Sequence, residues 1–152
     1  MTTLTRETCR AELVRRLSTV RPDTPRRWGR MSAPQMICHL SDAFLMMSGD
    51  KTVSESADRV PRVVIKWIAL YLPLRWPPEI KTRPELDQLV GGRCPGDFAA
   101  DVADVESWIE RMAKRPVRGP WPSHPVFGSM SGRNWMRWAY LHVDHHLRQF
   151  GL

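Results

Sequence analysis

The C-terminal segment constrains the fold of this chain most, because its apolar residues recur with the period of a helix. At about 100° per residue, a helical wheel gathers one set of residues on a single face: Trp135, Trp138, Ala139, His142, His146, Gln149 and Phe150. Arg137, Tyr140 and Asp144 lie on the opposite face. Two histidines therefore fall in the middle of a face that must be buried against other elements, and His145 falls at its edge.

Further segments carry helix-end signals or helical spacing. Thr5 is a candidate cap for a helix reaching about Val20, and Ser32 opens a capping box for a helix that ends at Ser48, before Gly49. The remaining predicted helices are an apolar stretch over Val63 to Leu72, one capped by Asp97 and ended by Pro116, and the C-terminal one, capped by Ser131. No run of residues alternates as a strand would, so the predicted class is all-α.

The connections between these helices differ in length. About a dozen residues separate the first helix from the second, whereas nearly fifty, broken by prolines and the Gly91-Gly92 pair, separate the second from the Asp97-capped helix. These lengths predict a four-helix bundle with one long crossover between its second and third helices, and the crossover carries the extra short helix. At 152 residues, the chain is expected to form a single domain over 1–152.

The stretch from Val63 to Leu74, within an apolar insertion over 61–78, is the most apolar part of the chain. It is too short for a membrane span, which needs about 20 residues, and it contains Lys66. Two interpretations remain: an interfacial helix anchored by the neighbouring Trp and Arg residues, or a flap that covers the open end of the bundle. The flap is the favoured interpretation.

Charge, cysteine and leader patterns limit the classes of protein that fit. The net charge of +7 comes from 23 Lys and Arg against 16 Asp and Glu, spread over every segment, which predicts a solvated basic surface and not a specific nucleic-acid partner. Cys9, Cys38 and Cys94 form no C-x-x-C pair and are expected to be reduced thiols. The first twenty residues do not resemble a signal peptide, so a cytoplasmic protein is expected, and a homodimer is left open.

Three histidines are positioned to share a metal ion. His142 and His146 are four residues apart and lie one turn above each other on the same helix face. His39 lies in the middle of the apolar face of the helix that Ser32 opens. Three buried imidazoles are difficult to satisfy with hydrogen bonds alone, whereas a shared cation satisfies all of them. A single buried histidine such as His39 is, taken alone, more often a hydrogen-bonded core residue.

Several nearby residues have candidate supporting roles. Asp42, one turn beyond His39, is either an acceptor for the outer N–H of a ligand or a solvated carboxylate. His145 is a candidate general base, with a hydrogen-bonding role at the rim of the site as the alternative. Cys38 is expected to be packed and not ligating, and His124 is expected to be a structural loop residue and not a fourth ligand.

The motifs at both ends of this predicted site resemble the DinB-like metalloproteins. They are Gln35-Met36-Ile37-Cys38-His39-Leu40, His124-Pro125-Val126-Phe127-Gly128, Trp135, and His142-x-x-His145-His146-x-Arg148-Gln149-Phe150-Gly151. The resemblance covers most of the chain and implies a four-helix bundle whose ligands are His39, His142 and His146, with zinc or nickel as the metal. Leu147 stands where many members of that superfamily carry Arg, which weakens inferences about substrate but not about the ligands.

The same resemblance implies an enzyme that transfers a low-molecular-weight thiol to an electrophile, or one that catalyses an isomerisation that depends on such a thiol. A divalent ion on three neutral imidazoles keeps its charge and lowers the pKa of a bound thiol or water, so metal-assisted hydrolysis is equally open. The expected partner is therefore a small molecule. The alternative is a non-catalytic, metal-stabilised binding or scaffold protein, because the sequence shows no identifiable acid-base pair.

Overall fold

A computed structural model describes residues 1–56, 61–78 and 80–152. Its helices are α1 (Glu7–Leu17), α2 (Ala33–Ser48), α3 (Arg62–Tyr71), α4 (Phe98–Lys114) and α5 (Gly132–Gln149), with a single-turn 3-10 helix, η1 (Pro84–Leu86). These described ranges contain no strand, and their only β-type pairing is an isolated bridge between His124 and Gly128. The prediction of an all-α chain is confirmed.

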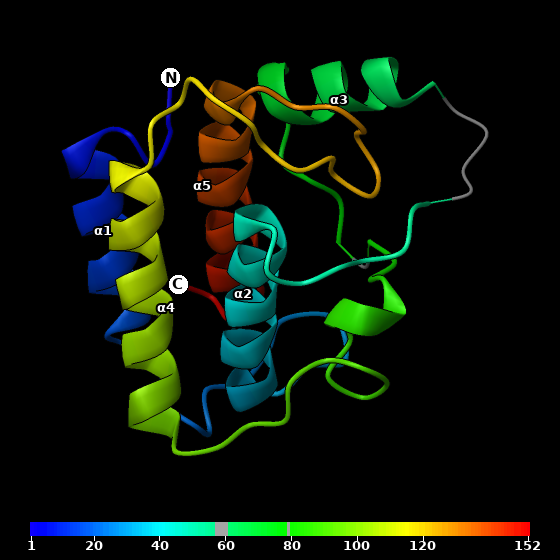
Figure 1. Ribbon diagram of the computed structural model, residues 1–152. Coiled ribbons are helices and arrows are strands. Elements are labelled where there is room, and N and C mark those ends of the chain that lie inside the picture. The colour runs from blue at the N-terminus through cyan, green and yellow to red at the C-terminus, as the bar shows by residue number, and fades with distance from the viewer. Residues whose placement is uncertain (57–60, 79) are drawn as a thin grey trace.

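Four of the helices form a bundle. Helix α2 packs against α4 and α5, and α1 packs against the same two helices (Figure 1). The side chains between them include six with no exposed surface: Leu13, Ile37, Met47, Ile109, Trp135 and Met136. The centre of the bundle is therefore filled mainly with apolar side chains.

The predicted helix ends are confirmed for three of the bundle helices. Ser32 and Gln35 form the reciprocal capping box of α2, and Gly49 ends this helix in the left-handed conformation at φ 96°. The side chain of Asp97 accepts a hydrogen bond at the start of α4, and that of Ser131 does so at the start of α5. The N–H groups of a first helical turn lack partners within the helix, and these side-chain oxygens provide them.

The predicted limits of the first helix are wrong at both ends. Arg6 occupies the N-cap position of α1 without a side-chain hydrogen bond, while the hydroxyl of Thr5 lies near that of Thr3. At the other end, the Ser18 and Thr19 hydroxyls donate to the carbonyls of Arg15 and Arg16. These side chains take acceptors that a continuing helix would use, so α1 ends at Leu17 and does not reach Val20.

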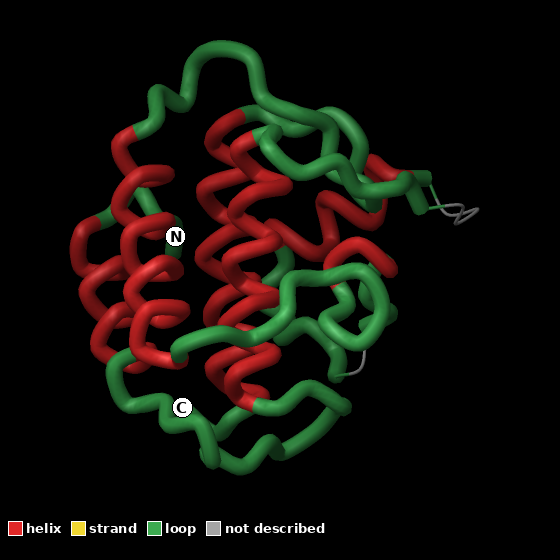
Figure 2. Tube along the Cα trace, turned by 60° about the horizontal axis from the view of Figure 1, so that its bottom comes forward, coloured by secondary structure: helices red, strands yellow, loops and turns green. Residues whose placement is uncertain are grey.

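The long connection between α2 and α4 carries α3, as predicted, and also η1, which was not predicted. Both lie on the same side of the bundle, and α3 packs against α5 (Figure 2). Ile65, Ile68 and Ala69 of α3 line a cavity, whereas its outer face is exposed, with Val63 at 69% and Trp67 at 57%. The inner face agrees with the flap interpretation, whereas the exposed apolar outer face also fits the interfacial helix. No helix in the described part of the chain is long and apolar enough to cross a membrane.

Candidate metal centre

The bundle brings His39 of α2 together with His142 and His146 of α5. The Nε2 atom of His142 lies 3.2 Å from Nε2 of His39 and 3.2 Å from Nε2 of His146. One ligand atom from each histidine falls in a group whose members are all within 4.8 Å of one another. Zn–N bonds of about 2.0–2.1 Å in a tetrahedral site imply N···N separations of roughly 3.3 Å, so both short distances suit a shared ion.

The outer partner of His39 fixes which of its nitrogens is free. Its Nδ1 lies 2.8 Å from the carbonyl oxygen of Leu86. A carbonyl only accepts, so Nδ1 carries the proton and donates it, and Nε2 is left with a lone pair. His39 as a whole is only 3% exposed. Leu86 thus sets the imidazole in the form that binds a cation.

His146 is held in the same form through an amide relay. Its Nδ1 lies 2.8 Å from Oε1 of Gln149, while Nε2 of Gln149 donates to the carbonyl of Trp28 at 3.0 Å. The Trp28 carbonyl accepts only from the amide nitrogen, so the amide oxygen faces His146. His146 therefore donates from Nδ1 and, like His39, directs an Nε2 lone pair toward His142.

Hydrogen bonding alone does not satisfy this arrangement. Two lone pairs converge on Nε2 of His142, which has at most one proton to donate. Burial lowers the pKa of all three imidazoles, and the nearby histidines lower it further for His142 and His146, so the neutral, metal-binding form is favoured. The three nitrogen atoms therefore fit a divalent cation as ligands. Without a cation, at least one of their lone pairs has no partner.

A cavity of about 390 Å³ opens directly onto the three histidines. The ring of His142 stacks on Trp138 at 4.6 Å between centroids and 13° between planes. From the other side, the Trp76 ring lies 6.3 Å from that of His142, and its Nε1 donates to the Ala69 carbonyl at 2.8 Å. The flap thus contributes an aromatic wall that faces the histidines.

The side chain of His145 makes no hydrogen bond to another described residue, so the structure gives no support to the alternative of a hydrogen-bonding role at the rim. This histidine is 5% exposed, and its Nδ1 atom is buried with no hydrogen-bond partner among the described residues. Its ring lies 5.2 Å from that of His146 and 5.9 Å from that of Trp76. Burial lowers the pKa of His145 to about 4, so the side chain is neutral at pH 7. Its role as general base stays a prediction.

His124 is a structural loop residue, as predicted. Its Nδ1 accepts hydrogen bonds from the backbone N–H groups of Val126 and Phe127, at 3.1 and 3.2 Å, and its ring stacks on that of Phe127. The side chain lines the same cavity but is not part of the three-histidine group. It therefore shapes the loop that forms one wall of the cavity.

Burial of His124 makes stability depend on pH. Desolvation lowers its pKa to about 3, against about 6.5 in the unfolded chain. Above pH 6.5 the imidazole is neutral in both states, and below it the unfolded chain gains a proton that the folded chain does not. Between pH 7 and pH 5, this difference lowers the free energy of unfolding by about 2 kcal/mol. We expect His124→Asn, which keeps an acceptor but does not titrate, to lack this part of the loss. Urea unfolding at both pH values measures this, and an unchanged pH dependence would contradict it.

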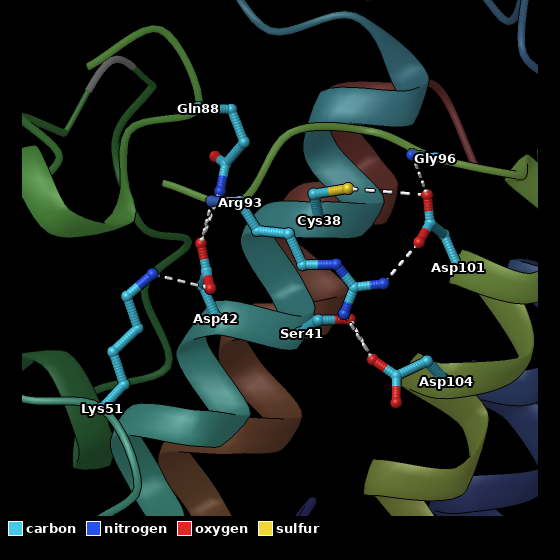
Figure 3. Close-up of polar contacts among 9 residues, drawn as sticks. All are labelled: Cys38, Ser41, Asp42, Lys51, Gln88, Arg93, Gly96, Asp101 and Asp104. Carbon is cyan, nitrogen blue, oxygen red and sulfur yellow. Dashed lines mark hydrogen bonds and ion pairs between the residues drawn. The ribbon is translucent and has the colours of Figure 1, made fainter. Parts of the chain in front are cut away.

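Asp42 matches neither of its two predicted roles. It is 1% exposed, and its carboxylate accepts from Nζ of Lys51 at 2.7 Å, Nε2 of Gln88 at 2.9 Å and the backbone N–H of Arg93 at 2.8 Å (Figure 3). It is therefore neither solvated nor bonded to His39. The carboxylate instead attaches the segment around η1 to α2. Leu86, whose carbonyl holds His39, lies two residues before Gln88.

Arg93 extends this polar cluster to α4. Its guanidinium group forms ion pairs with Asp101 and Asp104, and Asp101 also accepts from the backbone N–H of Gly96 at 2.9 Å (Figure 3). The Ser41 hydroxyl donates to Asp104 at 2.9 Å, which closes the cluster back onto α2. The loop after η1 is thus bound to both helices beside it.

Cys38 is packed and not ligating, as predicted. It has no exposed surface, and its thiol lies 3.7 Å from the carboxylate of Asp101, away from the histidines. Burial, together with the charge of Asp101, raises the pKa of this thiol to about 11. The structure contains no disulfide among these cysteines, in agreement with the expected reduced thiols.

Thiol accessibility gives a simple check of this packing. Cys9 and Cys38 are buried, whereas Cys94 is exposed. We expect Ellman's reagent to modify about one thiol per native chain quickly, and all three only after unfolding, because thiolate exposure controls reactivity. Cys94→Ser should remove the fast phase. A fast phase of two or more thiols in the native protein would contradict the buried positions.

Sequence reasoning missed the two groups that orient the outer ligands. The helical wheel places Gln149 on the buried face of α5, and its position three residues after His146 is a usable signal for their contact. The sequence does not single out the Leu86 carbonyl, because every residue has a backbone carbonyl. Only the path of the connection brings this one to His39.

Comparison with known proteins gives one match over most of the chain. No curated protein and no solved structure matches it. The matched part includes His39, His142 and His146, as well as both outer partners of the ligand histidines. Because a family model aligns with residues 11–151, the chain belongs to the family described as "Protein of unknown function (DUF1569)".

Proposed function

We propose that this protein is a divalent-metal-dependent enzyme of the DinB-like type, with His39, His142 and His146 as its ligands. The observation that carries the proposal is the pair of fixed tautomers: Leu86 and Gln149 each hold an Nδ1 proton, so two Nε2 lone pairs meet at His142. Imidazole ligands suit zinc and nickel, which are the metals we propose.

The surroundings of the cluster support catalysis more than a structural role. Structural zinc sites have four protein ligands, whereas catalytic ones have three and leave one position for water or substrate. Among the described residues, the group that could hold an ion has three members, and all of them line the cavity. A small molecule that enters the cavity therefore reaches the three imidazoles directly.

The proposed reaction is transfer of a low-molecular-weight thiol to an electrophile, with metal-assisted hydrolysis as the second possibility. When bound, a divalent ion on neutral ligands lowers the pKa of a coordinated thiol or water and stabilises the anion as a nucleophile. The protein contributes positioning: Trp138 stacks on His142, and Trp76 with α3 forms an apolar wall of the cavity. The competing hypothesis is a metal-stabilised scaffold without turnover.

Cobalt substitution distinguishes the enzyme from the scaffold. We expect untagged protein to contain about one divalent ion per chain, and the visible spectrum of its cobalt(II) form to change when 2-mercaptoethanol is added. The same thiol should add faster to an absorbing electrophile such as 1-chloro-2,4-dinitrobenzene, with a pH profile that reflects a lowered thiol pKa. An unresponsive spectrum together with no thiol turnover would reject the enzyme and favour the scaffold.

A further inference from the structure

The cavity over the histidines has an apolar wall. Its apolar lining comes from α2, the flap, the segment through η1, the loop before α5 and α5 itself: Met46, Ile65, Ile68, Ala69, Leu74, Trp76, Pro77, Ile80, Leu86, Pro125, Val126, Phe127 and Trp138. Apart from the histidines, its polar lining consists of Thr82 and three cationic side chains. A ligand that fills this space must therefore have an apolar body.

The charged groups around the cavity are all of one sign. Arg75, Lys81 and Arg83 line it, and no carboxylate does so in the described part of the chain. None of the three cations forms an ion pair with another described residue, although other arginines on the protein do. Glu85, outside the cavity lining, interacts electrostatically with Arg83, but the lining itself carries only positive charge among the described residues.

Arg83 is the cation best placed to hold a ligand. Its Nη2 donates to the Ser54 hydroxyl at 2.7 Å, which fixes the guanidinium group. Its Nε atom is buried and has no hydrogen-bond acceptor among the described residues. The guanidinium group belongs to a residue that lines the cavity, so it offers a fixed positive charge to an anion bound there.

We propose that this cavity binds an amphiphilic anion, with a carboxylate at Arg83 and an apolar chain along the flap and Trp138. The inference rests on the proposed function and deepens it, because it names the class of substrate for the same cavity. The volume of about 390 Å³ holds a ligand of modest size. At roughly 30 Å³ per heavy atom, the share of one water molecule in the liquid, it accommodates about a dozen heavy atoms. Octanoate, with its ten heavy atoms, is a suitable probe.

Calorimetric titration of the metal-loaded full chain tests the class of ligand. We expect octanoate to bind, and affinity to rise about threefold to fourfold for each methylene from hexanoate to octanoate, as burial of one methylene predicts. 1-Octanol and octyltrimethylammonium, which keep the chain but lose or reverse the charge, should bind at least tenfold more weakly. Equal or tighter binding of the cation, or an affinity independent of chain length, would overturn the proposal.

Variants locate the two ends of the ligand. Arg83→Met should weaken octanoate at least tenfold without affecting 1-octanol, and Arg83→Lys should recover part of the loss. Arg133→Met is the matched control, because Arg133 is exposed and does not line this cavity. For the chain, Ala69→Phe should block binding, whereas Val64→Phe, on the exposed face of the same helix, should not. Octanoate binding unchanged in both Arg83→Met and Ala69→Phe would overturn the proposal.

Parallel metal analysis separates this inference from the proposed function. Protein that binds one metal ion and responds to thiol, but shows no preference for octanoate over the cation, rejects the amphiphilic anion and keeps the metal enzyme. Protein that binds octanoate at Arg83 but no metal rejects the metal enzyme and keeps the anion site. The two proposals therefore fail independently.

Discussion

Replacing His39 or His146 by alanine is expected to reduce bound divalent metal from about one ion per chain to nearly zero. Each of these histidines directs a fixed lone pair into the cluster, and the two that remain after its removal cannot complete the site. His145→Ala is the matched control, because this neighbouring residue lies outside the three-histidine group and should retain its metal. Metal analysis after dialysis measures all three variants. Full metal content in His39→Ala would show that His39 is not a metal ligand.

Thermal unfolding provides an independent measure of the same loss. A ligand that binds only the folded state stabilises it by about 2.7 kcal/mol when present at 100 times its Kd. The melting temperature of the unmodified protein and of His145→Ala should therefore rise when zinc is added, and that of His39→Ala should not. A chelator should bring the first two proteins back to their metal-free values. This comparison also shows that the His39→Ala protein is folded.

The parts of the site that were predictable depend on local patterns within one helix. His142 and His146 share a face because they are four residues apart, and Ser32 and Gly49 fix the length of α2 and hence the depth of His39. The meeting of the two helices required one further assumption, that both apolar faces enter the same bundle. The structure confirms it through the 3.2 Å contacts of His142.

The parts that were not predictable depend on the path of the long connection. Leu86 offers a backbone carbonyl, and Asp42 is a carboxylate that local spacing could not place in the interior. Both acquire their roles only because the segment around η1 folds over α2 and brings Gln88 and Arg93 to Asp42. Contacts between distant segments of this kind have no period in the sequence.

The polar cluster at Asp42 yields the second large expected effect, on stability. Asp42→Ala should lower the free energy of unfolding by about 3–5 kcal/mol, the usual cost of removing one partner of a buried ion pair. Lys51, 21% exposed in its side chain, turns to water, but Gln88 is 7% exposed and the N–H of Arg93 is held in the loop. Two buried donors would then lack an acceptor.

A surface aspartate supplies the control for this change. Asp50 is exposed and accepts a hydrogen bond from the nearby Ser48, so Asp50→Ala should change stability by no more than about 0.5 kcal/mol. Urea unfolding of both variants measures the difference, and a cost below about 1 kcal/mol for Asp42→Ala would show that the cluster is not a strong anchor.

The same variant also connects the cluster to the histidines. Because Gln88 lies two residues after Leu86, loosening it lets the carbonyl move away from Nδ1 of His39. Loss of such an outer hydrogen bond typically weakens a metal site 10-fold to 100-fold. When zinc binding is measured at low denaturant, where the Asp42→Ala protein is folded, this variant should therefore bind zinc more weakly, while Asp50→Ala binds it normally. Normal zinc affinity in Asp42→Ala, despite lower stability, would mean that η1 holds His39 without help from this carboxylate.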